Sequence, residues 1–220
     1  MPDLNSSLYT DMLRSSARGR SLPRRLFGAI RREFTSKPLY GLEWGDPETV
    51  EPLRFIRDRW VIPYVRPDYT ALEIGPGGGR WTRYLLQFKR LYVVDFHQEL
   101  SSELRKNFHR PNMVFIRNNG TDFPGVPDRA VDYVFSFDTF VHLDPPLIEA
   151  YLGNLKRIVS PGGNVVLHYS DKTKPMAQEN PTFSANDPIK MRAMVAAAGF
   201  QVAEEDLTTM WHSSLIRLTH

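Results

Sequence analysis

A glycine-rich run between two apolar segments is the first part of this sequence with the residue types for chemistry. It reads Glu73–Ile74–Gly75–Pro76–Gly77–Gly78–Gly79–Arg80. Glycines let the backbone approach a ligand closely, and a helix that starts after them offers unpaired N–H groups. A dinucleotide fingerprint requires G-x-G-x-x-G, and a Walker A loop ends in Gly-Lys-Ser/Thr. Neither spacing is present, so the run predicts a ligand site of another kind.

An acidic residue, Asp95, follows the next apolar segment, twenty residues after Gly75. A carboxylate at the end of a second strand can accept hydrogen bonds from both ribose hydroxyls of an adenosine-containing ligand. Each feature alone has a plainer interpretation, a tight turn for the glycines and a solvated strand end for the aspartate. Their order and spacing together favour the ligand site.

Two further groups of polar residues follow later strands. Asp138 and His142 come after residues 131–136, whereas His168 and Tyr169 end residues 163–169. Ligands of open α/β sheets bind outside the carboxyl ends of the strands. Two imidazoles and a carboxylate could form a general base with an orienting acid, or they could bind Mg²⁺ or another divalent ion. Because Mg²⁺ prefers oxygen ligands, we do not predict a metal. Either histidine could instead be structural.

Strands and helices alternate from Thr70 onward, which predicts a parallel sheet with helices on both faces. The expected strands are residues 70–74, 90–94, 112–116, 131–136, 163–169, 200–204 and 213–218, and the expected helices are 80–88, 97–108, 145–159 and 188–198.

The region before Thr70 has a different character. Asp46 is expected to cap a helix that begins at Pro47 and buries Leu53, Ile56 and Trp60. We therefore expect two parts, a basic helical appendage or cap over residues 1–66 and a ligand-binding domain over residues 67–220.

The stretch from Thr70 to about Phe200 resembles the class I S-adenosylmethionine-dependent methyltransferases. Five motifs match in order: the E-x-G-x-G-x-G loop at 73–79, the acid at 95, the strand exit at 117–123, the fourth strand with its exit at 131–143, and the helix–turn–strand entry at 155–163. The resemblance implies a Rossmann-like, doubly wound, seven-stranded and mostly parallel sheet whose last strand is antiparallel.

The resemblance also implies a cofactor site for S-adenosylmethionine. Glu73 would hold the methionine amino end, Asp95 the ribose, and Phe96 would lie beside the adenine. Asn119 occupies a position that usually holds an aspartate contacting the adenine, and Asp122 is the alternative. The full set implied is Glu73, Gly75, Gly77, Gly79, Trp81, Asp95, Phe96, Asn119, Gly120 and Phe137.

Methyl transfer in this family is an in-line displacement, for which the protein mainly positions the acceptor. A hydroxyl acceptor benefits from a base, so the catalytic candidates are His142, His168 and Asp138. Aromatic and acidic residues suit a hydroxylated ring, and the substrate-binding candidates are Tyr40, Glu43, Trp44 and Tyr169. Trp44 could instead anchor the appendage, and the segment Trp211–His212 is open to the same two interpretations, a contact with the substrate or a packing anchor. Residues 170–186 are long enough for a lid, or they form a surface crossover.

The overall pattern is similar to bacterial small-molecule O-methyltransferases, and we expect a hydroxylated acceptor such as a sugar, a glycan end or a secondary metabolite. The fourth strand lacks the Asn/Asp-Pro-Pro-aromatic motif of amino-directed base methyltransferases, and the chain has no cysteine nucleophile. Nucleic acid is therefore not the expected partner. RNA methylation and a non-catalytic S-adenosylmethionine-binding regulator remain the alternatives.

The charge of the 220-residue chain is unevenly distributed. Its net charge is +3, but residues 14–37 hold eight basic residues and one acidic residue, which leaves −4 for the rest. This basic segment could contact a membrane surface, bind an anionic substrate or cover the cofactor site as a solvated helix. The absence of cysteine and of a long apolar run favours a cytoplasmic protein.

Overall fold

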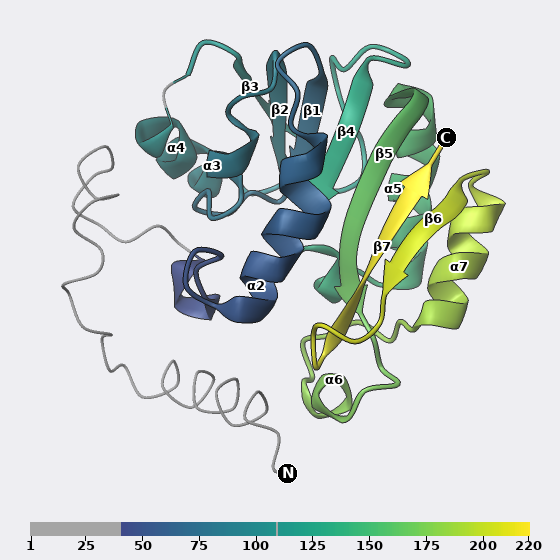
Figure 1. Ribbon diagram of the computed structural model, residues 1–220. Coiled ribbons are helices and arrows are strands. Elements are labelled where there is room, and N and C mark those ends of the chain that lie inside the picture. Colours follow the sequence, from purple (N-terminus) through teal and green to yellow (C-terminus); the bar gives the residue numbers. More distant parts are fainter. Residues whose placement is uncertain (1–40, 109) are drawn as a thin grey trace.

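The structure is a computed structural model that describes residues 41–108 and 110–220 (Figure 1). Its centre is a seven-stranded sheet in the order β3-β2-β1-β4-β5-β7-β6. The strands are β1 (Thr70–Ile74), β2 (Arg90–Asp95), β3 (Met113–Arg117), β4 (Val131–Ser136), β5 (Val159–Ser170), β6 (Gln201–Asp206) and β7 (Ser213–Thr219).

The strand pairing confirms the predicted fold class. β1 runs parallel to both β2 and β4, and β4 runs parallel to β5. β7 is antiparallel to β5 and to the edge strand β6. The strand order reverses between β1 and β4, which leaves a crevice outside their carboxyl ends. Because β7 runs the opposite way, its amino-terminal end reaches this same edge of the sheet.

Helices cover both faces of the sheet (Figure 1). One face carries α5 and α7, and the other carries α2, α3 and α4. Their bounds are α2 (Glu51–Ile56), α3 (Thr82–Leu85), α4 (Gln98–Asn107), α5 (Pro145–Ile158), α6 (Pro175–Glu179) and α7 (Pro188–Ala197).

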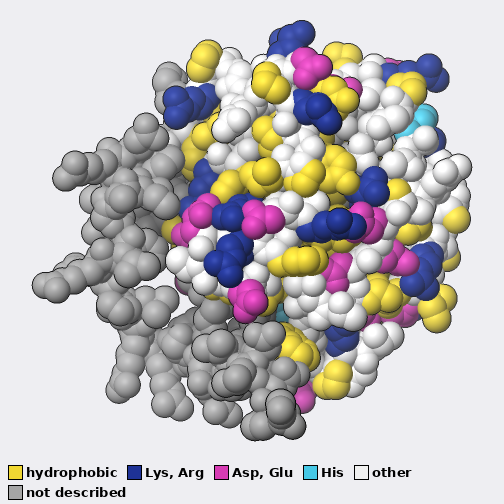
Figure 2. All heavy atoms as spheres, in the orientation of Figure 1, with side chains coloured by type: hydrophobic (Ala, Val, Ile, Leu, Met, Phe, Trp, Pro, Cys, Tyr) yellow, Lys and Arg dark blue, Asp and Glu magenta, His cyan; other side chains and the backbone are white. Residues whose placement is uncertain are grey.

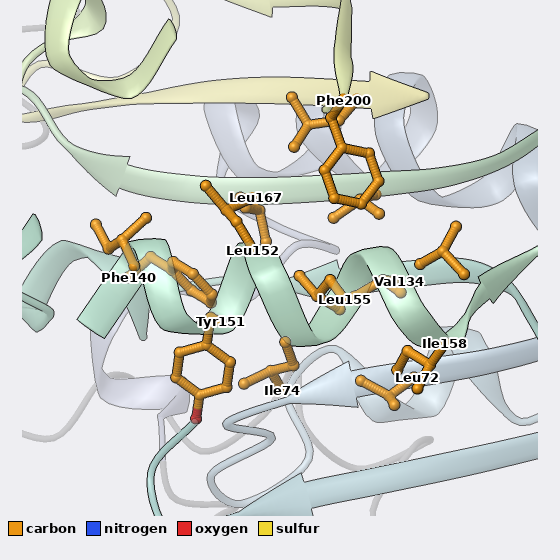
Figure 3. Close-up of a cluster of buried hydrophobic side chains, with 14 of the residues drawn as sticks. Leu72, Ile74, Val134, Phe140, Tyr151, Leu152, Leu155, Ile158, Leu167 and Phe200 are labelled. Carbon is orange, nitrogen blue, oxygen red and sulfur yellow. The ribbon is translucent and has the colours of Figure 1, made fainter. Parts of the chain in front are cut away.

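The core on the α5 face follows the 3.6-residue period of that helix. Ile148, Leu152 and Leu155 are fully buried and belong to one cluster with Leu72 and Val134 of the sheet. Figure 3 shows Leu152 and Leu155 of α5 within this cluster. Burying a side chain of this size stabilises a fold by roughly 1.5–3 kcal/mol. This face therefore holds the sheet rigid beneath its carboxyl-end edge.

The core on the other face includes part of the predicted appendage. Leu53 and Ile56 of α2, together with Trp60 in the following π-helical turn (Arg57–Val61), are buried against the sheet. The Tyr133 hydroxyl of β4 donates a hydrogen bond of 2.5 Å to the carbonyl of Trp60. Residues 51–61 thus share a core with the strands that they precede. Residues 1–40, which hold the basic segment and Tyr40, lie outside the described residues.

Two local expectations are wrong. The Asp46 carboxylate accepts from the Glu48 N–H within a turn and pairs with Arg83, so the helix begins four residues later than predicted, at Glu51. The helix expected at 80–88 is reduced to α3, because the glycine loop continues as turns up to Trp81. Residues 170–186, for which a lid or a surface crossover was expected, contain the short helix α6.

Oppositely charged side chains are interspersed on the face of the molecule that carries α2 (Figure 2). Arg57 lies 2.7 Å from Glu48 and also pairs with Asp58. None of the described helices is long and apolar enough to cross a membrane.

Candidate active site

A cavity of about 810 Å³ opens at the carboxyl-end edge of the sheet. Its lining comes from Gly41, Trp44, Leu53, Ile74, Gly75, Pro76, Gly77, Arg80, Trp81, Val94, Asp95, Phe96, His97, Asn119, Gly120, Phe137, Asp138, Thr139, Val141, His142, Leu143, Leu147, Tyr151, Met176, Asn180, Thr182, Phe183, Met210 and His212. The glycine loop, Asp95, Asp138 and His142 thus meet around one space, as the sequence predicts.

The start of the glycine loop requires glycine. Gly75 has a φ of +67°, and a Cβ placed there would lie 2.0 Å from the Thr139 Oγ1. Gly77 also has a positive φ, of +55°, and lines the cavity. A side chain at Gly75 would strain the backbone and push the loop away from the strand end.

Gly79 does not line the cavity. A Cβ at this residue would lie 2.2 Å from the Phe108 ring and 2.7 Å from Leu104. A glycine is needed at position 79 because the loop packs tightly against Leu104 of α4 and against Phe108, the residue after α4. Gly79 thus has a packing role, and its contact with the cofactor stays a prediction.

Asp95 and Phe96 line the cavity next to the glycine loop, and we call this part of the cavity its cofactor end. Asp95 Oδ1 accepts from the His97 N–H at 2.7 Å, and burial raises the pKa of this carboxyl above its ordinary value. Phe96 is 52% exposed although it is aromatic. A Cβ at Gly120 would meet only the Phe96 ring, at 3.9 Å, so there is open space beside that ring.

Asn119 lines the cavity, but its amide oxygen already has donors. Asn119 Oδ1 accepts from the backbone N–H groups of Thr121 and Asp122 at 3.0 and 3.1 Å. Asp122 Oδ1 in turn accepts from the Asn119 N–H at 2.8 Å. Both predicted adenine-contacting side chains therefore hold the shape of their own loop.

Glu73 lies behind the glycine loop and is buried. Its Oε2 accepts from the Thr82 hydroxyl at 2.6 Å. Burial, with a smaller effect from the Asp95 charge, raises the pKa of Glu73 to about 8. The side chain does not line the cavity, although the next residue of β1, Ile74, does.

Asp138 lies at the exit of β4 and forms an ion pair with Arg80. Its backbone has a φ of +60°, which is uncommon for a residue other than glycine. Burial would raise the pKa of the Asp138 carboxyl, but the Arg80 charge outweighs it and holds this pKa below its usual range. Arg80 is buried and also donates to the Gly45 carbonyl at 3.4 Å. Arg80 was not among the predicted site residues, although it directly follows the glycines.

His168 is fully buried in β5 and does not line the cavity. Its Nδ1 lies 3.1 Å from the Asp138 backbone N–H and 3.2 Å from Asp138 Oδ1, and its Nε2 contacts the Ser213 hydroxyl. Burial lowers the pKa of His168. The Phe137 ring stacks on it at 4.0 Å. These contacts place His168 beneath Asp138, away from any acceptor.

His142 is exposed and reaches the cavity from the short turn Phe140–His142. Its Nδ1 lies 2.9 Å from the Thr182 carbonyl oxygen. A carbonyl only accepts, so Nδ1 carries the hydrogen and the neutral ring has its lone pair on Nε2. The segment after α6 thus sets the tautomer of this histidine.

Aromatic and sulfur-containing side chains line the part of the cavity around His142. Phe183 packs edge-on against His142 at 5.5 Å and against His212 at 5.1 Å. Burial lowers the pKa of His212 to about 4, so that ring is neutral near pH 7. Sequence reasoning missed Met176, Asn180, Thr182, Phe183 and Met210, because their segments join the site only through the fold.

The predicted substrate-binding residues have different positions. Trp44 lines the cavity, but Glu43 points away and accepts from the Gly41 N–H at 2.8 Å. Tyr169 is buried within the α5 core, on the opposite face of the sheet. The prediction that it contacts the substrate is therefore wrong. Trp81 lines the cavity and packs on Phe137 at 4.7 Å.

Among residues 41–108 and 110–220, no group of three or more His, Asp or Glu side chains is placed to hold a metal ion. The residues do suit S-adenosylmethionine, because a tight glycine cradle, a buried strand-end carboxylate and an open aromatic ring follow one another along the cavity. This arrangement offers close backbone approach, acceptors for ribose hydroxyls and a stacking surface.

Comparisons with known proteins agree with this geometry. Residues 71–163 match the family described as "Methyltransferase domain". An S-adenosylmethionine-dependent methyltransferase from Mesorhizobium loti has a TM-score of 0.65 at 11% identity, covering 79% of this chain and 100% of that chain. Geranyl diphosphate C-methyltransferase from Streptomyces coelicolor A3(2), in complex with Mg²⁺, geranyl diphosphate and S-adenosyl-L-homocysteine, has a TM-score of 0.64 at 14% identity, covering 77% and 80%.

A chain from the complex between the Haloferax volcanii Trm112 methyltransferase activator and its methyltransferase has a TM-score of 0.59 at 17% identity, covering 84% of this chain and 99% of that chain. At these identities the likeness shows a shared fold. The family match points to a methyltransferase domain, and the strand order and the glycine-loop end of the cavity are consistent with it. Residues 71–163 therefore match a methyltransferase domain, within a fold that S-adenosylmethionine-dependent methyltransferases share.

Proposed function

We propose that this chain transfers a methyl group to a hydroxyl of a small molecule, with His142 as the general base. The observation that carries the proposal is the 2.9 Å contact between His142 Nδ1 and the Thr182 carbonyl oxygen. It leaves the Nε2 lone pair as the proton acceptor of a residue that lines the same cavity as Gly75 and Asp95. A neutral nitrogen acceptor attacks through its own lone pair and would have less need of such a base.

The cofactor supplies an electrophilic methyl carbon when it is bound. Gly75 and Gly77 would receive its methionine part, Asp95 would accept from its ribose hydroxyls, and Phe96 would pack on its adenine. His142 Nε2 takes the proton from the acceptor hydroxyl, a contribution worth typically 10²–10⁴-fold in rate.

Asp138 and His168 act in this proposal as positioning residues. The Asp138 carboxylate is engaged by Arg80, and His168 Nδ1 lies against the Asp138 backbone. Their contacts hold the turn after β4 in its left-handed conformation, and His142 follows four residues later in that turn. We thus assign proton transfer to His142 alone.

The test compares His142→Gln and His142→Ala with the unchanged protein. Radiolabelled methyl transfer to a panel of hydroxylated small molecules, amines and RNA identifies the acceptor class. With a hydroxyl acceptor, we expect both variants to lose about 100-fold or more in turnover. Cofactor affinity, measured by calorimetry, should stay within about twofold.

Two controls separate the base from a structural role. His220→Gln changes an exposed histidine that is absent from the cavity lining, and it should keep full activity. Added imidazole should restore part of the rate of His142→Ala, because the missing side chain leaves room for it. Full turnover by both His142 variants, or label found only in RNA or amines, would contradict the proposal. Cofactor binding without turnover on any acceptor would favour the regulatory alternative.

A further inference from the structure

The part of the cavity that surrounds His142 is chemically distinct, and we call it the acceptor wall. It consists of Trp44, His142, Met176, Asn180, Thr182, Phe183, Met210 and His212. We infer that the acceptor wall takes an uncharged acceptor built on a flat aromatic ring, so that the reacting hydroxyl is of the phenol type rather than a sugar hydroxyl. This inference rests on the proposed hydroxyl methylation.

The charges near the acceptor wall argue for an uncharged ligand. Among the described residues that line the cavity, Arg80 is the one lysine or arginine, and Asp138 neutralises it. Lys174, which precedes α6, directs its ammonium group to the carbonyl oxygens of Met210 and Ser213 at 2.9 and 2.6 Å. A phosphate or carboxylate on the acceptor would therefore find no uncompensated lysine or arginine among the described residues of this wall, and its burial would be costly.

The polar groups of the wall are largely bonded to one another. Asn180 Oδ1 accepts from the backbone N–H and the hydroxyl of Thr182 at 3.0 and 2.8 Å. The Asn180 carbonyl accepts from Lys172 Nζ at 3.0 Å. A sugar has several hydroxyls, and each one left without a partner in the cavity would weaken binding. A ring with a single hydroxyl needs only the His142 acceptor.

Carboxylates, the usual partners of vicinal sugar hydroxyls, are also missing from this wall. In the part of the lining that the structure describes, the acidic side chains are Asp95 and Asp138. Asp95 lies at the cofactor end, and Asp138 is bound to Arg80. Neither is placed to hold a pair of hydroxyls on the acceptor.

The apolar groups of the wall are well suited to a ring. Phe183 contacts both His142 and His212 edge-on, so its ring is fixed between two other rings. Met176 and Met210 add thioethers, which pack favourably against aromatic rings and adapt to their outline. Trp44 supplies a further large flat surface at the mouth.

The experiment measures binding and methyl transfer separately with matched probes. The probes are a naphthol, the hydroxynaphthoate that adds a carboxylate, the saturated decahydronaphthol, and methyl glucoside. Calorimetry of the full chain with S-adenosylhomocysteine gives affinity without turnover. We expect the naphthol to bind at least about tenfold more tightly than each of the other three. Equal or tighter binding of methyl glucoside or hydroxynaphthoate would overturn the inference.

Variants of Phe183 test the wall itself. Phe183→Leu keeps an apolar side chain but removes the ring, and it should weaken naphthol binding about fivefold or more. Ile189→Ala changes a residue of α7 that is 77% exposed and should leave binding unchanged. Unchanged naphthol affinity in Phe183→Leu would contradict a role for this ring.

Methyl transfer to the same probes distinguishes the proposed hydroxyl methylation from the inferred aromatic acceptor. Methylation of methyl glucoside but not of naphthol would overturn the aromatic acceptor and leave the proposed function standing. Selective naphthol binding with methylation only of the matching naphthylamine would support the wall chemistry and overturn hydroxyl methylation. Methylation of naphthol in preference to decahydronaphthol supports both.

Discussion

The two ends of the cavity are built in different ways. The cofactor end uses the exits of adjacent parallel strands, with Gly75 after β1, Asp95 at the end of β2 and Gly120 after β3. The acceptor wall collects residues from four segments that are distant in sequence: around Trp44, the turn after β4 that holds His142, around α6, and before β7. The sheet itself fixes the first end, whereas side-chain contacts between segments fix the second. The second can therefore change its chemistry while the fold stays the same.

The ties that hold the acceptor wall are specific. Lys174 Nζ donates to the carbonyls of Met210 and Ser213, which joins the start of α6 to the segment before β7. The Ser184 N–H donates to the Val141 carbonyl at 2.8 Å, which joins the segment that follows α6 to the turn of His142. Arg80 contacts both Gly45 and Asp138, and it thereby connects the segment around Trp44 to the exit of β4.

Asp95→Ala should have the largest effect and should act on the cofactor end alone. Removing the carboxylate takes away charge-assisted hydrogen bonds to ribose, worth about 1.5–3 kcal/mol each. We expect cofactor affinity to fall by about 100-fold or more. Calorimetry with S-adenosylhomocysteine measures it, with Asp68→Ala, an exposed carboxylate just before β1 at the other edge of the sheet, as the control. Unchanged affinity would rule out the ribose assignment.

Asp138→Asn should destabilise the junction between the two ends. Removing one partner of a buried ion pair costs about 3–5 kcal/mol. Because 34% of the Asp138 side chain is exposed and water screens the pair, we expect about 2 kcal/mol and a Tm lower by about 4–8 °C. Asparagine tolerates a positive φ, so the backbone is not the cause of the change.

The control for this variant is Asp128→Asn. Asp128 pairs with Arg157, but 69% and 42% of their side chains are exposed. Such a pair contributes about 0–1 kcal/mol, so Tm should hardly move. If both variants lower Tm equally, Arg80 and Asp138 do not form a special junction. Calorimetric or fluorescence melting curves decide the question.

The same contrast explains what could be predicted from sequence. The strands and the glycine loop depend on local patterns, namely apolar runs of strand length, a glycine cluster and an acid twenty residues later. The cofactor end follows because parallel strands end at one edge. Gly79 was assigned to the cofactor because the motif contains it, but its partner Phe108 lies just after α4, almost thirty residues later, and is not visible in the pattern.

The acceptor wall could not be predicted in the same way. Met210 and Phe183 reach the cavity because β7 is antiparallel and because α6 folds back over the strand ends. Asp46 has the right type for a helix cap, but its carboxylate pairs with Arg83, thirty-seven residues away, and this long-range pair competes with the local cap. Arg80 was similarly hidden, since its partners Gly45 and Asp138 are far away in sequence.

Lys174→Met should weaken the acceptor wall and spare the cofactor end. The variant keeps the apolar stem but leaves two carbonyl oxygens, those of Met210 and Ser213, without their donor. We expect kcat/KM for the acceptor to fall about tenfold, or about 1.4 kcal/mol, with cofactor affinity within about twofold. Lys190→Met is the matched control, because this exposed lysine donates to the Ala185 carbonyl and its residue does not line the cavity. Equal losses in both variants would argue against a specific tie.

Glu73→Gln should have only a small effect on cofactor affinity and should show the clearest dependence on pH. The pKa of Glu73 is about 8 in the folded chain and ordinarily 4.5, so the carboxyl is mostly neutral at pH 7. A raised folded pKa means that Glu73 contributes stability below about pH 4.5, and that this contribution is lost as the pH rises through about 8. Glutamine keeps an acceptor for the Thr82 hydroxyl without ionising. The variant should therefore be more stable than the unchanged protein at pH 9, and melting curves measure it.

The cofactor offers a second measurement on the same residue. If Glu73 receives the ammonium of the methionine part, it must ionise on binding and release close to one proton at pH 7. Calorimetry in phosphate and in Tris, which differ in ionisation enthalpy, counts that proton. We expect the release to disappear in Glu73→Gln while affinity falls only about two- to fivefold. Proton release that persists in the variant would mean that Glu73 stays neutral and supports the loop through Thr82 alone. The cofactor end would then hold the methionine part through backbone contacts of the glycine loop.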